Sequence, residues 1–126
     1  MYTPLLKGPG KDNQASDGRN ANSKTGTPAV LKEVQKLVKD RNFDEARSLL
    51  LKAIEEEPEN AAFLLIISKL QTFSKEYESA FVFAQRSSKA DPLNAKALIQ
   101  QATIKFKLEQ YADALEIIDA SLSIDP

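Results

Sequence analysis

Residues 60–92 read NAAFLLIISKLQTFSKEYESAFVFAQRSSKADP, and this stretch decides the fold because its landmarks recur at a fixed distance along the chain. Four columns of residues are each spaced by 34 positions. They are a proline (Pro58, Pro92, Pro126), an alanine (Ala46, Ala80, Ala114), an aromatic (Phe43, Tyr77, Tyr111) and a small residue (Ala53, Ser87, Ser121). A period of this length is typical of solenoids in which each repeat is a pair of helices. The sequence therefore predicts three such repeats.

Apolar residues recur at helical spacing inside each repeat, as in the run Phe43, Ala46, Leu50 and Ala53. The small column lets two helices approach closely, since a side chain larger than methyl would push their axes apart. Asparagine, a favoured N-cap, precedes the first helix of the second and third repeats, at Asn60 and Asn94. We therefore expect an all-α fold, a right-handed superhelical solenoid of three helix–turn–helix repeats.

The columns resemble those of the tetratricopeptide repeat family, whose small, aromatic and proline positions coincide with the ones above. The resemblance covers residues 27–126 and implies repeats at 27–60, 61–94 and 95–126. The family's tryptophan, glycine and tyrosine columns, in the first helix of each repeat, are not kept. They are occupied by Val30, Leu64 and Leu98; by Val34, Ser68 and Ala102; and by Leu37, Gln71 and Lys105.

Residues 1–26 differ from the rest and are predicted to form a flexible tail. All four glycines lie here among many Asn, Ser and Asp, so the segment has little apolar surface with which to offset its ordering entropy. Residues 18–25, GRNANSKT, come close to a phosphate-binding loop. Because Ser23 replaces the second glycine and no apolar strand precedes the motif, we expect no nucleotide cofactor.

The composition excludes several classes of function. Histidine and cysteine are absent, which rules out disulfides, thiolate nucleophiles, zinc sites built from them and imidazole bases. No nucleophile lies in a pattern with a base and no pair of carboxylates stands out, so we expect neither an enzyme nor a cofactor or metal. A net charge of −1 does not point to nucleic acid. Neither a transmembrane run nor a signal peptide is recognisable, so we expect a cytoplasmic protein.

The resemblance also implies where a partner would bind, because the first helix of each repeat lines the family's concave face. Thirteen residues are candidates for this groove. They are Leu31, Lys32, Gln35, Lys39, Leu65, Ile66, Lys69, Phe73, Lys96, Ile99, Gln100, Thr103 and Lys107. Five are lysines and none is acidic. This pattern suits an acidic partner segment with apolar anchors, although lysines on a helix face can also serve only to solvate it.

One known binding mode of the family is not expected. The carboxylate clamp that holds chaperone C-termini needs Lys, Asn, Asn, Lys and Arg at set groove positions. This chain has Leu31, Gln35, Ile66, Lys96 and Gln100 there, and only Lys96 agrees.

The sequence thus favours a non-catalytic protein-binding module or scaffold, and two alternatives stay open. The repeats could be the N-terminal regulatory or scaffolding region of a larger enzyme whose catalytic domain lies beyond Pro126. They could also self-assemble through the open ends of the solenoid. The last repeat offers apolar residues for such contacts at Leu108, Leu115, Ile118 and Leu122.

Overall fold

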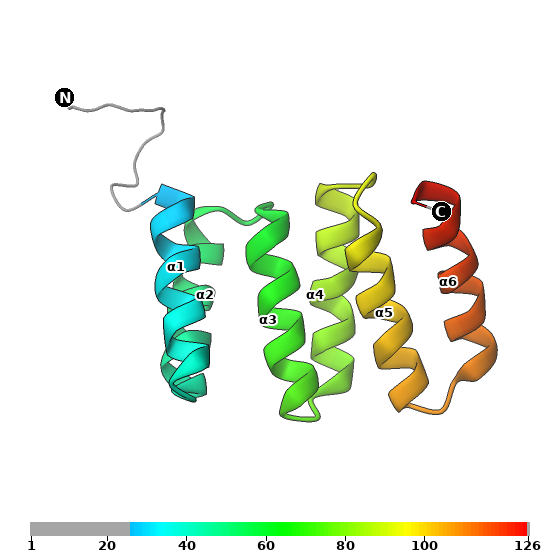
Figure 1. Cartoon of the computed structure of the whole chain (residues 1–126), viewed down its shortest axis with the longest axis horizontal. Helices are drawn as coiled ribbons and strands as arrows, with labels where there is room; N and C mark the ends of the chain where they lie inside the picture. Colours follow the sequence, from blue (N-terminus) through cyan, green and yellow to red (C-terminus); the bar gives the residue numbers. More distant parts are fainter. Residues whose placement is uncertain (1–25, 126) are drawn as a thin grey trace. The chain divides into compact units, whose positions relative to one another are not determined.

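The computed structural model describes residues 26–125, and this part of the chain contains six helices and no strand (Figure 1). They are α1 (Gly26–Lys39), α2 (Phe43–Glu56), α3 (Ala61–Phe73), α4 (Tyr77–Ala90), α5 (Ala95–Lys107) and α6 (Tyr111–Ile124). The predicted all-α class is confirmed. The prediction of a flexible tail falls outside the described residues, except at Gly26, which is the first residue of α1.

The chain forms two compact units, one ending at Asn42 and the other beginning at Phe43. The first unit contributes α1 to the described residues. Lys32, Gln35 and Lys39 are exposed on this helix, while Leu31 is half-buried. The second unit contains α2 to α6, and all further packing described below lies within it.

The first helix of each pair ends in the same way, with a non-glycine residue in the left-handed conformation. These residues are Arg41, Lys75 and Glu109, with φ of 62°, 66° and 63°, and they are spaced by the same 34 positions. At the end of α3, Lys75 N donates to Thr72 O over 3.0 Å and Glu76 N donates to Gln71 O over 2.8 Å. This pair of bonds is a Schellman motif, which satisfies carbonyls that the helix end leaves free.

Helix starts follow the prediction in part. Asn60 Oδ1 accepts a hydrogen bond from Phe63 N over 3.2 Å, and Asn94 Oδ1 accepts one from Lys96 N over 3.0 Å. Both asparagines are therefore the expected N-caps of α3 and α5. The second helices α4 and α6 begin instead after Glu76 and Gln110, whose side chains make no capping bond.

Within the second unit the helices pack in chain order, each on the next, and α3 also touches α5 (Figure 1). Between α4 and α5 the core consists of Ala80, Ala84 and Ile104, all fully buried, and partly buried Tyr77, Phe81 and Leu108 surround them. Ala80, where α3 and α4 cross, has no exposed surface. This agrees with the expectation that a small residue allows the two helices to approach closely. Burial of this apolar surface is the main driving force for folding.

A buried polar network ties α3 to α4 and to α5. Ser68 Oγ donates to Ala80 O on α4 over 2.7 Å, and Thr72 Oγ1 donates to Ser68 O over 2.8 Å. From α5, Gln100 Nε2 donates to Thr72 Oγ1 over 3.0 Å. Because each buried polar group has a partner, the cost of its desolvation is offset.

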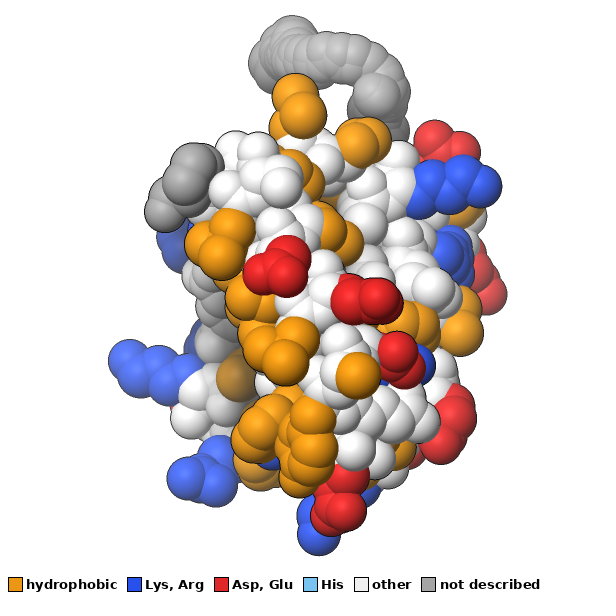
Figure 2. Space-filling view, turned by 90° about the vertical axis from the view of Figure 1, so that its right-hand side faces the viewer, with side chains coloured by type: hydrophobic (Ala, Val, Ile, Leu, Met, Phe, Trp, Pro, Cys, Tyr) orange, Lys and Arg blue, Asp and Glu red, His pale blue; other side chains and the backbone are white. Residues whose placement is uncertain are grey.

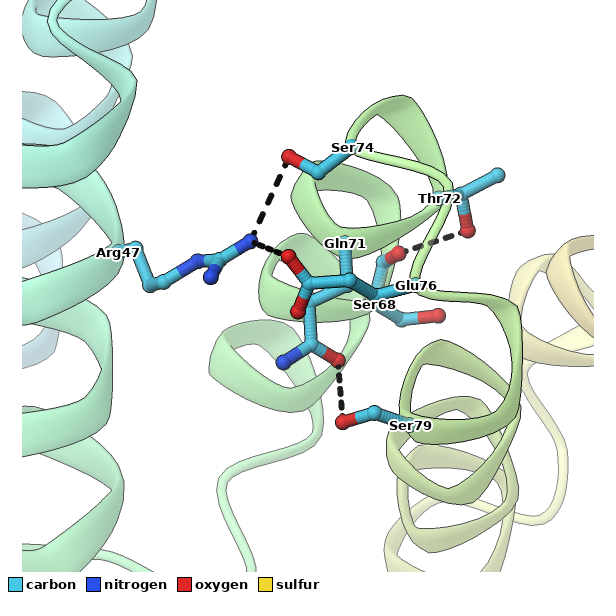
Figure 3. Close-up of polar contacts among 7 residues, drawn as sticks. All are labelled: Arg47, Ser68, Gln71, Thr72, Ser74, Glu76 and Ser79. Carbon is cyan, nitrogen blue, oxygen red and sulfur yellow. Dashed lines mark hydrogen bonds and ion pairs between the residues drawn. The ribbon is translucent and has the colours of Figure 1, made fainter.

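A second polar cluster joins α2 to the turn between α3 and α4 (Figure 3). Arg47 Nη2 lies 2.8 Å from Glu76 Oε2 and donates a longer bond, 3.4 Å, to Ser74 Oγ. Nearby, Ser79 Oγ donates to Gln71 Oε1 over 2.9 Å. The ion pair is partly exposed, so we expect it to contribute at most about 1 kcal/mol.

Candidate functional site on α3 and α5

Nine of the thirteen predicted groove residues lie on α3 and α5, two helices of the second unit that are in contact. The other four, Leu31, Lys32, Gln35 and Lys39, belong to α1 in the first unit. Within the second unit, the candidate site therefore lies on α3 and α5.

The nine residues divide into an exposed set and a buried set. Exposed side chains are those of Lys69, Phe73, Lys96, Ile99, Thr103 and Lys107. Ile66 is half-buried, whereas Leu65 and Gln100 are buried. The side-chain amide of Gln100 hydrogen-bonds to Thr72 and Ser68 in the interior. It therefore supports the packing under the surface and has little exposed area for a partner to contact.

Two large apolar side chains stand on this surface among the lysines. Phe73 is 68% exposed and Ile99 is 52% exposed. The ring of Phe73 lies 5.2 Å from that of Phe43 on α2, which limits its freedom despite the exposure. Exposed apolar groups beside charged ones are typical of interaction surfaces.

A first pocket, of about 300 Å³, lies at the carboxyl ends of α3 and α5. It is lined by Lys69, Thr72, Phe73, Lys75, Tyr77, Gln100 and Lys107, and we call it the lysine pocket. Four of these residues are among the thirteen groove candidates, while Thr72, Lys75 and Tyr77 are not. Lys75 could have been found only by recognising the left-handed turn residue after α3, and no glycine marks that position.

A second pocket, of about 590 Å³, lies at the amino end of α5 and is called here the α5–α6 pocket. Its lining residues are Asp91, Leu93, Asn94, Ala95, Lys96, Ile99, Ile124 and Asp125. Two carboxylates share this pocket with Lys96, whereas the lining of the lysine pocket contains none. The lysines on this face are therefore in two different electrostatic environments.

Helix α6 presents a separate surface that combines apolar and acidic side chains (Figure 2). Tyr111, Leu115, Ile118 and Leu122 are all exposed by 40% or more. The helix carries Asp113, Glu116 and Asp119 and has no basic residue. Tyr111, of the aromatic column, is half exposed, and its ring packs edge-on against Phe106 at 5.3 Å.

Two other findings bear on function. Within residues 26–125 no group of three or more acidic side chains is arranged to hold a metal ion. No helix in this range is both long and apolar enough to span a bilayer.

Comparison with solved structures identifies the fold. The TPR2B domain of yeast Sti1, in a complex with pHsp70, superposes with a TM-score of 0.73 at 21% identity, over 78% of this chain and 78% of that chain. The second TPR of Spaghetti (RPAP3), bound to the HSP90 peptide SRMEEVD, gives 0.71 at 15% identity, over 78% and 91% of the two chains. MamA of Desulfovibrio magneticus RS-1 gives 0.72 at 14% identity, over 78% of this chain and 55% of that chain.

These matches show that the chain has a tetratricopeptide-like repeat fold, with six described helices consistent with three repeats. No family model and no curated protein sequence matches the chain. At these identities the likeness concerns the fold alone.

Proposed function

We propose that this chain is a non-catalytic module that binds a segment of a partner protein on the surface formed by α3 and α5. The partner segment is acidic and carries apolar anchors. The observation that carries the proposal is the lysine pocket, where three lysines and no carboxylate lie beside exposed Phe73. Structures of the same fold support it, since the RPAP3 domain holds an acidic peptide, SRMEEVD.

The chemistry of the surface favours an extended or helical segment in which acidic and apolar side chains alternate. Acidic side chains of the partner would meet Lys69 and Lys107, and an apolar side chain would cover Phe73 or Ile99. Each exposed ion pair contributes only about 0–1 kcal/mol, so charge alone gives weak binding. Burying an apolar anchor adds about 25 cal/mol per Å², and the charges then set orientation and association rate.

The clamp residues used by the family for chaperone tails are not reproduced. Ile66 is half-buried and Gln100 is engaged in the interior, while Lys96 shares its pocket with Asp91 and Asp125. The proposed partner is therefore an internal acidic segment and not a chain terminus held through its end carboxylate.

The test uses a fluorescein-labelled peptide of alternating Glu and Leu or Phe, together with its Lys-for-Glu analogue. Replacing Lys69→Glu and Lys107→Glu together, both in the lysine pocket, removes two attractions and adds two repulsions. We expect the affinity for the acidic peptide to fall by about tenfold or more, since about 1.4 kcal/mol corresponds to a factor of ten. Binding should also weaken as salt rises, because screening acts on exposed charges.

The control is the double reversal Lys52→Glu and Lys89→Glu on α2 and α4, which changes the net charge by the same amount away from the site. It should leave the affinity nearly unchanged, with circular dichroism confirming helicity in both variants. Equal losses in the two double variants would reveal a nonspecific charge effect. Tight binding of the Lys-for-Glu analogue would contradict the proposal directly.

A second candidate function, self-association, is favoured by the surface of α6. Leu115 is 63% exposed and Leu122 is 50% exposed, and together with Ile118 they form an apolar surface that water contacts. Light scattering over a concentration series tests it. The variant Leu115→Gln with Leu122→Gln should then remain monomeric where the parent chain associates. A parent chain that stays monomeric at high concentration would exclude this candidate.

A further inference from the structure

The lysine pocket gathers positive charge from three different elements. Lys69 comes from α3, Lys75 from the turn after it and Lys107 from the last residue of α5. Among residues 26–125 none of the three lysines has an ion-pair partner. The acid next to Lys75 in sequence, Glu76, is held 2.8 Å from Arg47. The three ammonium groups are therefore available to a ligand.

A simpler explanation for these lysines is that they neutralise the negative partial charge at the carboxyl ends of helices. The carboxyl terminus of a helix carries roughly half a negative charge, and both α3 and α5 end at this pocket. Two such ends offset about one of the three positive charges, while the amino terminus of α4, which begins at Tyr77, adds back about half a positive charge. An excess of about two to three positive charges remains, which matches a dianion better than a single carboxylate.

The pocket is also larger than an anion alone requires. It is an open depression of about 300 Å³, at the lower end of the range for small-molecule pockets. The rings of Phe73 and Tyr77 line part of this volume. An occupant that fills it needs a flat apolar part against these rings and a charged end among the lysines.

Few neutral hydrogen-bond donors remain in the lining. Thr72 Oγ1 donates to Ser68 O and accepts from Gln100 Nε2, so both side chains face the pocket with their donors already engaged. Recognition then depends mainly on the lysines, with the hydroxyl of Tyr77 as a neutral donor beside them. A phosphate ester carries close to two negative charges and three acceptor oxygens, enough to meet three ammonium groups.

From these observations we infer that the lysine pocket recognises an aryl phosphate, the side chain of a phosphotyrosine, within the partner segment. The inference rests on the proposed function and specifies its ligand. The ring lies against Phe73 and Tyr77, and the phosphate oxygens lie among Lys69, Lys75 and Lys107. An unphosphorylated tyrosine brings the ring without the charge, and a glutamate brings one charge without the ring.

The experiment is an amide NMR titration of the full chain with three small probes. Phenyl phosphate carries both ring and dianion, inorganic phosphate lacks the ring, and phenylacetate carries a ring with a single charge. The titrations are run at neutral pH, where the phosphate ester is above its second pKa of about 6. We expect phenyl phosphate to shift the amides of Lys69, Lys75, Tyr77 and Lys107 and to bind about tenfold more tightly than either other probe.

Matched variants test the assignment of the charges. Lys75→Gln with Lys107→Gln should weaken phenyl phosphate binding by about tenfold, whereas Lys52→Gln with Lys89→Gln should not change it. All four lysines are exposed, so both variants should keep their fold. Equal affinities for phenyl phosphate and phenylacetate, or shifts confined to other helices, would overturn the inference.

The two proposals fail in different ways. If phenyl phosphate does not reach the pocket while acidic peptide binding still depends on Lys69 and Lys107, the phosphate inference alone is wrong. If the acidic peptide binds independently of these lysines, the proposed function is wrong. Competition by phenyl phosphate for the labelled peptide would support both.

Discussion

The pairs α3–α4 and α5–α6 have the same columns of residues, yet they are buried to very different extents. In the first pair α4 lies between α3 and α5, and Ala80, Ala84 and Ser87 are fully or almost fully buried. In the second pair α6 packs on α5 and buries only Ala114 and Ser121. In a solenoid each repeat contacts its neighbours, so a column position has its full energetic weight only when both neighbours are present.

The largest expected contrast is between two isoleucines. Ile67 on α3 has no exposed surface, whereas Ile118 on α6 is 40% exposed. We expect Ile67→Ala to lower the free energy of unfolding by about 2–5 kcal/mol, because it removes buried groups and leaves a cavity. Ile118→Ala should cost about 1 kcal/mol or less, since the surface can relax and alanine is the better helix former. Urea denaturation of both variants measures the difference, and similar losses would mean that α6 is covered in solution.

Enlarging a side chain of the alanine column should also destabilise the α3–α4 pair more than the α5–α6 pair. Ala80→Leu introduces a larger side chain where α3, α4 and α5 leave no space, and we expect a loss of about 1–3 kcal/mol. Ala114→Leu, its counterpart one repeat later, should cost less than about 1 kcal/mol because α6 can shift outward. Thermal melts compare the two directly. An unchanged melting temperature for Ala80→Leu would show that the alanine is not at a close crossing.

The sequence predicted most of the fold because its information was periodic. Residues at the 34-residue spacing defined the helix pairs, and Asn60 and Asn94 marked two helix starts through a side chain with a specific capping role. The turns were harder to predict. Positive φ occurs at three residues that are not glycine, Arg41, Lys75 and Glu109. Hydrogen bonds of the backbone hold this conformation, and they cannot be recognised from the residue type.

The candidate site was predictable only in outline. The family resemblance placed Lys69 and Lys107 among the groove candidates, but it could not show that Gln100 turns inward to Thr72. Nor could it show that Lys96 lies among aspartates, because Asp91 and Asp125 come from two different turns of the chain. These features depend on which residues tertiary packing brings together.

A smaller contrast concerns two serines that share one column. Ser87 Oγ donates to Ala61 O at the start of α3 over 2.9 Å, so it joins two helices. Ser121 Oγ donates to Ile118 O within its own helix over 2.7 Å. We expect Ser87→Ala to cost about 1 kcal/mol, the usual contribution of a buried hydrogen bond. Ser121→Ala should change stability by less than about 0.5 kcal/mol, because the better helix propensity of alanine offsets the loss of the local hydrogen bond.

Chemical denaturation of the two serine variants decides this comparison. The exposed Ser123→Ala, whose hydroxyl also bonds within α6, serves as a control for the change in helix propensity. If Ser121→Ala lowered the free energy of unfolding as much as Ser87→Ala, the two serines would contribute equally to stability in both helix pairs.

The smallest expected effect is one that the two helix pairs should share. Lys75 and Glu109 have nearly identical positive φ, 66° and 63°, and their turns are closed by the same pair of backbone bonds. The left-handed conformation costs a non-glycine residue about 1–2 kcal/mol, and glycine loses about 0.5–1 kcal/mol more chain entropy on folding. Lys75→Gly and Glu109→Gly should therefore each stabilise the fold by about 0.5–1 kcal/mol.

This gain should be equal in the two pairs because it arises from local backbone geometry, whereas the losses above depend on neighbouring helices. Lys75→Ala and Glu109→Ala are the matched controls, since they remove the side chain but keep the Cβ atom that is strained at positive φ. They should give no stabilisation. A gain at Lys75 but not at Glu109 would mean that packing around α3 and α4, rather than the backbone alone, holds the turn in its left-handed conformation.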